Sequence, residues 1–188
     1  MPRIINRFSD VEPLSVESIV RAAVVVTDRE GLGALTMRRL GRELGVEAMS
    51  IYHHISNKAA LLELIALGVL ADADVDREDL SVVELLEHYG RRLRTSLVAH
   101  PASAPILAGS LPATAFASGT PQTAVGLLVD AGFDEYAGRW IIDAFVGFVV
   151  GHVLVAASTA RPSSQDADAT FETGLRFLLA GLRQELGE

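Results

Sequence analysis

The sequence predicts an all-α fold of two parts, and three observations favour it. Apolar residues between positions 15 and 30 recur at helical spacing. Two short helical patterns lie on either side of Gly45, a residue that suits a tight turn. Near the end of the chain, residues 135–158 and 167–186 form two long apolar helical patterns. With 188 residues, 49% of them hydrophobic, the chain can fill a substantial core.

The first predicted helix begins after Ser15 and ends at Gly31. The hydroxyl of Ser15 suits an N-cap, Glu17 favours the first turn, and glycine is a common helix terminator. The apolar residues at helical spacing are Val16, Ile19, Val20, Ala23 and Val26. They predict an amphipathic helix that buries one face.

The second predicted helix opens at Thr36, the next candidate N-cap. Leu40 and Leu44 would face inward. The side chains available to solvent or phosphate would be Arg38, Arg39 and Arg42.

The third predicted helix, residues 47–53, follows the turn at Gly45 and is barely two turns long. Ile51 would pack inward, and the helix must lean on the two before it because so short a helix is unstable alone. Two short helices around a glycine turn form the helix-turn-helix arrangement, whose recognition helix enters the major groove of DNA. These residues therefore predict a DNA-reading unit.

Four motifs in this region point to a family: LTMRRL, ELGV, SIYHHI and NKAALL. Residues 14–66 as a whole resemble the N-terminal domain of the tetracycline-repressor (TetR) family of bacterial regulators. Two later segments, AGFDEYAGRWIIDAFVGFVVGHVL and FETGLRFLLAGLRQEL, resemble the later helices of the tetracycline-repressor subgroup. The resemblance covers nearly the whole chain and implies a DNA-binding transcriptional regulator.

The resemblance implies DNA contacts for individual residues. Phosphate contacts, which anchor the domain without reading sequence, fall at Thr36, Ser50, Tyr52, His53 and Lys58. Base contacts fall at Arg38, toward guanine, at Glu47, toward a cytosine amine, and at Ala48 or Met49, toward a thymine methyl. The alternative is that Tyr52 and Met49 are packing residues and that Arg38 is a solvated helix arginine.

The predicted domains are residues 1–62, the helix-turn-helix domain, and residues 63–188, the effector-binding and dimerisation domain. A fourth helix, roughly Lys58 to Val75, would join them. The net charge of −8 at first argues against a nucleic-acid partner. However, residues 1–62 carry 8 Lys and Arg against 7 Asp and Glu, whereas residues 63–188 carry 8 against 17. The acidity belongs to the second domain, and we expect most DNA discrimination to come from placed contacts.

The second domain is predicted to be helical throughout. The expected helices cover residues 82–99, 123–131, 135–158 and 167–186, and the prolines at 101, 105, 112 and 121 punctuate short pieces. The resemblance implies that the last two helices pack against a second copy as a four-helix dimer interface, whereas the residues alone support close helix packing. A transmembrane helix is not expected, because the apolar run of residues 141–157 is shorter than a membrane span and contains Asp143 and His152.

The resemblance also implies an effector cavity in the second domain. By alignment, the positions that contact tetracycline and its metal fall near Leu107, Tyr89, Ala124 and Asp74, and all four differ from the tetracycline repressor. We therefore expect an apolar effector rather than a magnesium–tetracycline chelate. The residues expected to line the cavity are Tyr89, Leu93, Leu107, Phe116, Leu128, Phe148 and His152. The alternative is that they are ordinary core residues.

The sequence contains few features that would support catalysis or metal binding. The chain has no cysteine, which excludes disulfides, thiolate metal sites and cysteine nucleophiles. The acidic run of residues 72–79 lacks the glycine and glutamate of a calcium loop and is expected to be a solvated loop. The histidines are isolated or point apart, and the HExxH, GxSxG and GxxxxGK[ST] motifs are missing. No cofactor, metal site or enzyme activity is expected.

The leading hypothesis is a cytoplasmic homodimeric repressor that binds a palindromic operator on double-stranded DNA and is released by a small, apolar effector. The cytoplasm is expected because the N-terminus lacks the apolar core of a secretory signal. A DNA-binding regulator without an effector is one alternative. Another is an apolar-ligand carrier or an enzyme on a helical scaffold, which would show no salt-dependent DNA binding.

Overall fold

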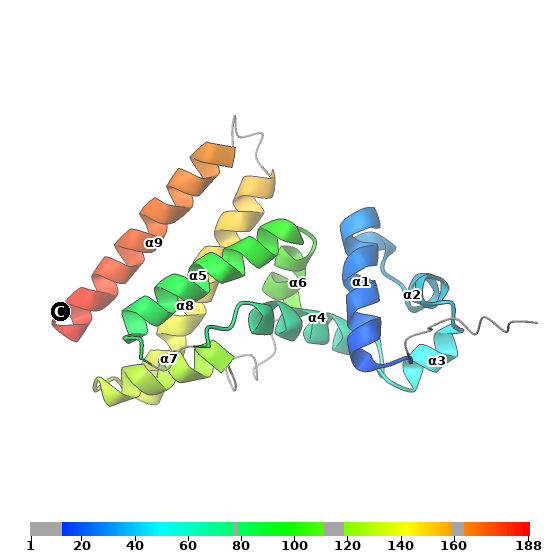
Figure 1. The fold of residues 1–188 in the computed structure, drawn as a ribbon, viewed down its shortest axis with the longest axis horizontal. Helices are drawn as coiled ribbons and strands as arrows, with labels where there is room; N and C mark the ends of the chain where they lie inside the picture. Colours follow the sequence, from blue (N-terminus) through cyan, green and yellow to red (C-terminus); the bar gives the residue numbers. More distant parts are fainter. Residues whose placement is uncertain (1–12, 77–78, 111–118, 159–163) are drawn as a thin grey trace, which may run out of the picture.

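The computed structural model describes residues 13–76, 79–110, 119–158 and 164–188 (Figure 1). All regular structure in these residues is helical, which confirms the predicted all-α fold. The elements are α1 (Val16–Glu30), the short 3-10 helix η1 (Leu32–Ala34), α2 (Met37–Leu44), α3 (Ala48–Tyr52), α4 (Lys58–Asp72), α5 (Val82–Ala99), α6 (Ser103–Ser110), α7 (Gly119–Asp130), α8 (Glu135–Ser158) and α9 (Ser164–Leu186).

Two hydrophobic cores meet within α4. Leu61 and Ile65, in its first half, pack with buried residues of α1, α2 and α3. Ala66, Val69 and Leu70, in its second half, pack with buried residues of α5, α7, α8 and α9. Figure 1 shows the result: α1 to α3 lie at one end of the molecule, α9 lies at the other, and α4 connects them.

Helix α6 also contributes to both cores. Ile106, which is 1% exposed, belongs to the core of α1 to α4. Its neighbour Leu107, also 1% exposed, belongs to the core of the later helices, as does Ala104. Pro105 lies in the first turn of α6, where its missing N–H leaves no hydrogen bond unmade. A helix of eight residues therefore lies between the two cores and contacts both.

Helix α7 begins at Gly119, four residues before the predicted start. The backbone N–H of Thr120 donates to the Asp74 carboxylate at 2.7 Å, and the Val75 N–H donates to the Thr120 hydroxyl at 2.8 Å. Gly119 has φ +65°, and a Cβ there would lie 2.5 Å from that carboxylate. The expectation of a merely solvated acidic loop is therefore wrong for Asp74, which is half-buried and caps a helix 46 residues away.

Helices α8 and α9 each carry large apolar side chains that remain exposed. Tyr136 and Trp140 on α8 are 72% and 70% exposed, and Phe177 on α9 is 69% exposed. The opposite side of α8, which includes Ile142 and Val149, is buried in the core. The expectation that this apolar segment is too short for a membrane span is wrong, because α8 has 24 residues and its composition also permits a span. Its packing on α5 and α7 is nevertheless that of a helix in a folded core.

Candidate nucleic-acid interface and effector region

Two glycines allow α2 and α3 to approach closely. Gly45 ends α2 in the left-handed conformation, with φ +68°, which glycine adopts without strain. A Cβ on Gly41 would lie 2.8 Å from the carbonyl oxygen of Val46 and 3.3 Å from the N atom of Ala48. The turn between the two helices therefore requires glycine at position 45 for its backbone angle. It requires glycine at position 41 because no Cβ fits beside the backbone of Val46 and Ala48.

Side-chain caps fix where the helices of this domain begin. The predicted cap at Ser15 is present, and Ser18 completes it as a capping box. The Thr36 hydroxyl accepts a hydrogen bond from the Arg39 N–H at 3.0 Å, so its own O–H is still able to donate to a phosphate oxygen. Asn57 caps α4, which leaves Lys58 exposed in the first turn of that helix.

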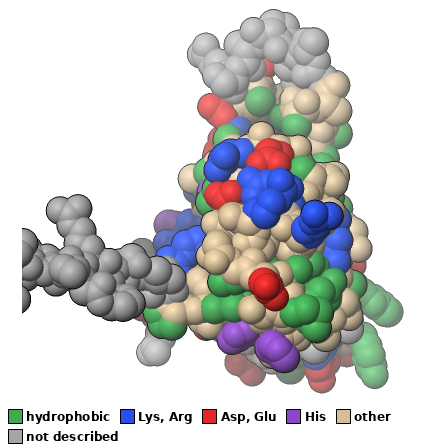
Figure 2. All heavy atoms as spheres, turned by 90° about the vertical axis from the view of Figure 1, so that its right-hand side faces the viewer, with side chains coloured by type: hydrophobic (Ala, Val, Ile, Leu, Met, Phe, Trp, Pro, Cys, Tyr) green, Lys and Arg blue, Asp and Glu red, His purple; other side chains and the backbone are tan. Residues whose placement is uncertain are grey.

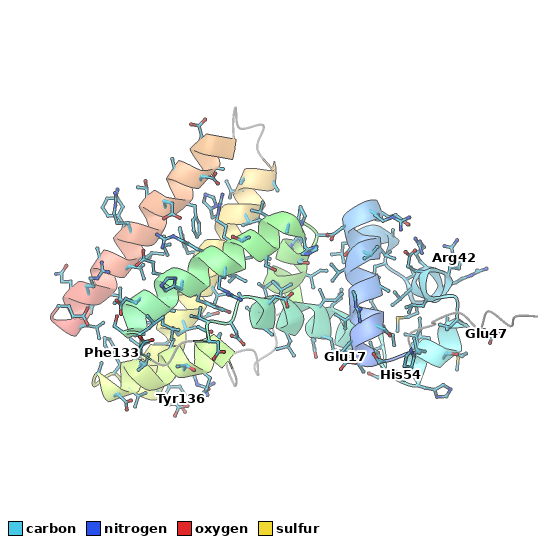
Figure 3. All side chains as sticks on the ribbon, viewed as in Figure 1. Glu17, Arg42, Glu47, His54, Phe133 and Tyr136 are labelled. Atoms are coloured by element: carbon cyan, nitrogen blue, oxygen red, sulfur yellow. The ribbon has the colours of Figure 1, made fainter. Side chains whose placement is uncertain are left out.

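The short helix α3 is held by its buried side and presents its outer side to solvent. Ile51 is completely buried, and Ile55 just beyond the helix is 2% exposed. Met49 and Tyr52 are 64% and 44% exposed. Figure 3 shows Glu47, just before α3, and Arg42, on α2, at the end of the molecule remote from α9.

The nine residues predicted to contact DNA all lie on α2, α3, α4 or directly beside them. Seven are exposed and two, Ala48 and Ser50, are half-buried. The exposed ones are Thr36, Arg38, Glu47, Met49, Tyr52, His53 and Lys58. Figure 2 views this end of the molecule and shows Lys and Arg side chains gathered on one part of it, with histidines at an edge.

Arg39 is not available to phosphate, contrary to the expectation from the sequence. Its guanidinium binds the carboxylates of Glu30, at the end of α1, and Glu43, on α2, and its side chain is only 15% exposed. The hydrogen bonds from Arg39 hold the pKa of the Glu30 carboxyl below its usual range, and the same contacts raise the pKa of Arg39. Among the described residues, Arg38 and Arg42 have no such carboxylate partner and remain open to a nucleic acid.

Polar contacts reinforce the junction between the two cores. The Nδ1 atom of His100, at the end of α5, lies 2.6 Å from the carboxylate of Asp28 near the end of α1. Arg92 on α5 donates to the carbonyl oxygens of Asp72 and Ala73 at the end of α4. The orientation of α1 and α4 relative to the later helices is therefore fixed by side-chain hydrogen bonds in addition to Ile106.

The residues predicted to line the effector cavity have different surroundings. Four are buried in the core of the later helices: Tyr89, Leu93, Leu107 and Leu128. Phe148 and His152 are half-buried and surround the ring of Phe171, and Phe148 stacks on it with centroids 5.6 Å apart. Phe116 lies outside the described residues.

Tyr89 carries a buried polar group. Its hydroxyl has no hydrogen-bond partner among the described residues. Burial raises the pKa of this hydroxyl, and the negative charge of Asp74 adds to the effect. A ligand or water that supplied a hydrogen-bond acceptor would remove the free-energy cost of this unsatisfied hydroxyl.

Small cavities open beside two of the predicted residues. One of about 230 Å³ is bordered by His152, Leu97, Arg94 and Asp168. Another, of about 280 Å³, lies between α6 and α8 and is bordered by Leu107, Gly147 and Gly151. Sequence reasoning missed Arg94, which pairs with Asp168 and lies over the Phe171 ring at 4.9 Å. Its partners are more than 70 residues away, so no local signal identifies it.

In the part of the chain that is described, potential metal ligands do not cluster. No group of three or more His, Asp or Glu side chains there could hold an ion. The clustered ionisable groups, such as Arg91 with Glu87 and Glu172, are surface ion pairs.

Comparison with known proteins relates both domains to the same family of regulators. Residues 19–65 match the family described as bacterial regulatory proteins, tetR family, and residues 76–165 match the tetracyclin repressor-like C-terminal domain. The chain is 30% identical to the class D tetracycline repressor protein of Escherichia coli over 199 residues, which cover 92% of this chain and 91% of the relative.

Two solved structures extend this similarity to three dimensions. A TetR variant from Acinetobacter baumannii AYE in complex with minocycline superposes with a TM-score of 0.79 at 29% identity, covering 92% of this chain and 98% of that one. ActR from Streptomyces coelicolor in complex with actinorhodin superposes with a TM-score of 0.74 at 27% identity, covering 94% and 100%.

Proposed function

Because the chain belongs to the TetR family and is a DNA-binding transcriptional regulator responsive to small-molecule effectors, we propose that it is a homodimeric repressor released from a palindromic operator by a small apolar effector. The observation that carries this proposal is the surface of α2 and α3. There, buried Ile51 anchors a short helix whose exposed side chains include Met49 and Tyr52.

DNA reading is assigned to two groups of residues on that surface. The residues that would hold phosphates are Thr36, Ser50, Tyr52, His53 and Lys58. Thr36 caps α2 and Lys58 is the first residue of α4, so both lie at helix N-termini, which favour anions. Arg38, Glu47, Ala48 and Met49 would meet base edges in the major groove. The side chain of Ala48 is a methyl group and is half-buried, so its exposed part can make only an apolar contact.

Dimerisation is assigned to the outer faces of α8 and α9. Tyr136, Trp140 and Phe177 form large exposed apolar surfaces, which soluble proteins usually bury in an interface. Gly147, on α8, has nothing within 4 Å of a Cβ, so a second helix could approach there. A twofold dimer would present its two recognition helices about 34–36 Å apart to a palindromic site.

The proposed effector is apolar because the positions aligned with tetracycline contacts no longer provide its ligands. Leu107 lacks a lone pair for a metal, and Ala124 is a buried methyl group. The similar proteins bound to minocycline and actinorhodin support an organic effector of small size. Displacement of α6 by an effector near Leu107 would also move Ile106 in the DNA-reading core, so effector and operator would oppose each other reciprocally.

The proposal also covers catalysis, cofactors and localisation. We expect no catalytic activity and no cofactor, in keeping with family members and relatives that are transcriptional regulators. We assign the protein to the cytoplasm, where its operator would be.

The decisive experiment is fluorescence anisotropy with the promoter DNA that flanks the gene and with a scrambled DNA, each at two salt concentrations. The proposal predicts tight, salt-sensitive binding to the flanking DNA alone. Adding candidate apolar molecules to the preformed complex should then release the DNA. Binding that no molecule reverses would favour a regulator without an effector, and no binding at low salt would contradict the proposal.

A further inference from the structure

Helices α1 and α4 border an open, apolar groove of about 620 Å³, which we call the junction groove. Its walls include Val20 and Val24 from α1 and Leu64, Leu67 and Gly68 from α4. It is larger than the cavities near His152 and Leu107, which measure about 230 and 280 Å³. Sites for small organic molecules usually measure roughly 300–1,000 Å³. The junction groove therefore has the size of a ligand site.

The apolar walls of this groove pack on the two cores at their base and remain partly exposed on their outer side. The core-facing residues of α1 are Ile19, Ala23 and Val26, each fully buried. Val20 and Val24 on its groove side are half-buried against that core, and Val25 beside them is 40% exposed. A Cβ added at Gly68 would meet nothing within 4 Å, so α4 leaves open space at the middle of the groove. An apolar face of this kind on a soluble protein indicates an interaction site.

The charged groups around the groove favour a positive ligand. Two carboxylates, Glu17 and Asp72, border it, against one guanidinium, Arg21, and the imidazole of His100. A hydrogen bond from its own backbone N–H and one from Ser15 hold the pKa of Glu17 below its usual range, and Arg21 contributes less. Figure 3 shows Glu17 at the start of α1, on the same side as α4.

We propose that the junction groove binds a lipophilic cation, at a site separate from the cavities among the later helices. The apolar body of the ligand would lie between the valines of α1 and Leu64, Leu67 and Gly68 of α4. Its charge would lie toward Asp72. Such a ligand would touch both helices and His100, and would stabilise the present arrangement of the junction. The binding itself is independent of the proposed repressor function, although its effect on operator affinity rests on that function.

Tetraphenylphosphonium and tetraphenylborate provide a matched test, because the two ions have nearly the same size and shape and opposite charge. Isothermal titration of the full-length protein should show binding of tetraphenylphosphonium and at least tenfold weaker binding of tetraphenylborate. Gly68→Phe, which fills the open space in the groove, should weaken tetraphenylphosphonium binding at least tenfold. Asp72→Asn should weaken it severalfold. Gly126→Phe serves as the control, since Gly126 on α7 also faces open space but lies outside the groove.

Three results would overturn the proposal. They are no tetraphenylphosphonium binding, equal binding of the two ions, and binding that Gly68→Phe leaves intact, which would assign the cation to the later helices. If circular dichroism shows that Gly68→Phe is unfolded, Val24→Phe narrows the groove from α1 and gives the same discrimination. DNA binding is measured separately, so a failed repressor hypothesis and a failed groove hypothesis remain distinguishable.

Discussion

Ile106→Ala should destabilise the DNA-reading core although Ile106 lies far from it in the sequence. The side chain is 1% exposed and packs among buried residues of α1 to α4. Removing the outer carbons of a fully buried isoleucine costs about 2–5 kcal/mol, because apolar burial is lost and a cavity remains. A loss of this size corresponds to roughly a 30-fold or greater increase in the population of locally opened states.

Hydrogen exchange followed by mass spectrometry is the appropriate assay, since it measures opening segment by segment. Peptides from α1, α2 and the first half of α4 should exchange roughly 30-fold faster or more in the variant than in the wild type. Peptides from α5 and α8 should change much less. The same variant should bind operator DNA more weakly, because α3 depends on this core for its position.

Leu107→Ala is the matched control. Leu107 is equally buried and adjacent in the chain, but it packs in the core of the later helices. This variant should therefore accelerate exchange in α5 and α8 rather than in α1 and α2. If both variants accelerated exchange equally in both halves of the molecule, the assignment of Ile106 and Leu107 to different cores would be refuted.

Further predictions concern DNA binding, pH and assembly. Lys58→Ala should weaken binding to all DNA sequences in anisotropy titrations, whereas Arg38→Ala should cost about 1–3 kcal/mol on the operator and relax preference at one base pair; equal losses on scrambled DNA would remove Arg38 from the base-reading set. The lowered pKa of Glu30 means that its contribution to stability is present above the ordinary glutamate pKa and is lost as pH falls through the lowered value. The urea midpoint of the wild type should thus fall more between about pH 5.5 and pH 3 than that of Arg39→Gln, and parallel curves would contradict this. Trp140→Glu should produce monomers in analytical ultracentrifugation, and an intact dimer would exclude this face of α8 as the interface.

Local signals in the sequence predicted much of the first domain. Ser15 and Thr36 cap helices, and Gly31 and Gly45 end them, as expected from the residues alone. Each of these signals acts within four residues, so no tertiary information is needed to interpret it. Ile51 could also be assigned to the core, because the helix it anchors is too short to form without burial.

Features that depend on distant residues could not be predicted in this way. Helix α7 begins early because Asp74, 46 residues upstream, caps it. Arg39 looked like a phosphate ligand because its partner Glu30 reaches it only when α1 packs on α2, although Glu43, four residues further along α2, is a local partner. The lining of an effector cavity is harder still, since it requires knowing which of many buried side chains leave space between them.

The sharing of α4 by two cores places a constraint on how the chain can vary. Each added helical residue rotates everything that follows by about 100° and moves it by about 1.5 Å. An insertion between Ile65 and Ala66 would therefore turn the second half of α4 out of phase with the first, and one of the two cores would lose its side chains from that helix. Hybrid regulators that join this DNA-reading domain to a foreign effector domain should be spliced within α4 without changing its residue count, so that the helical phase is preserved.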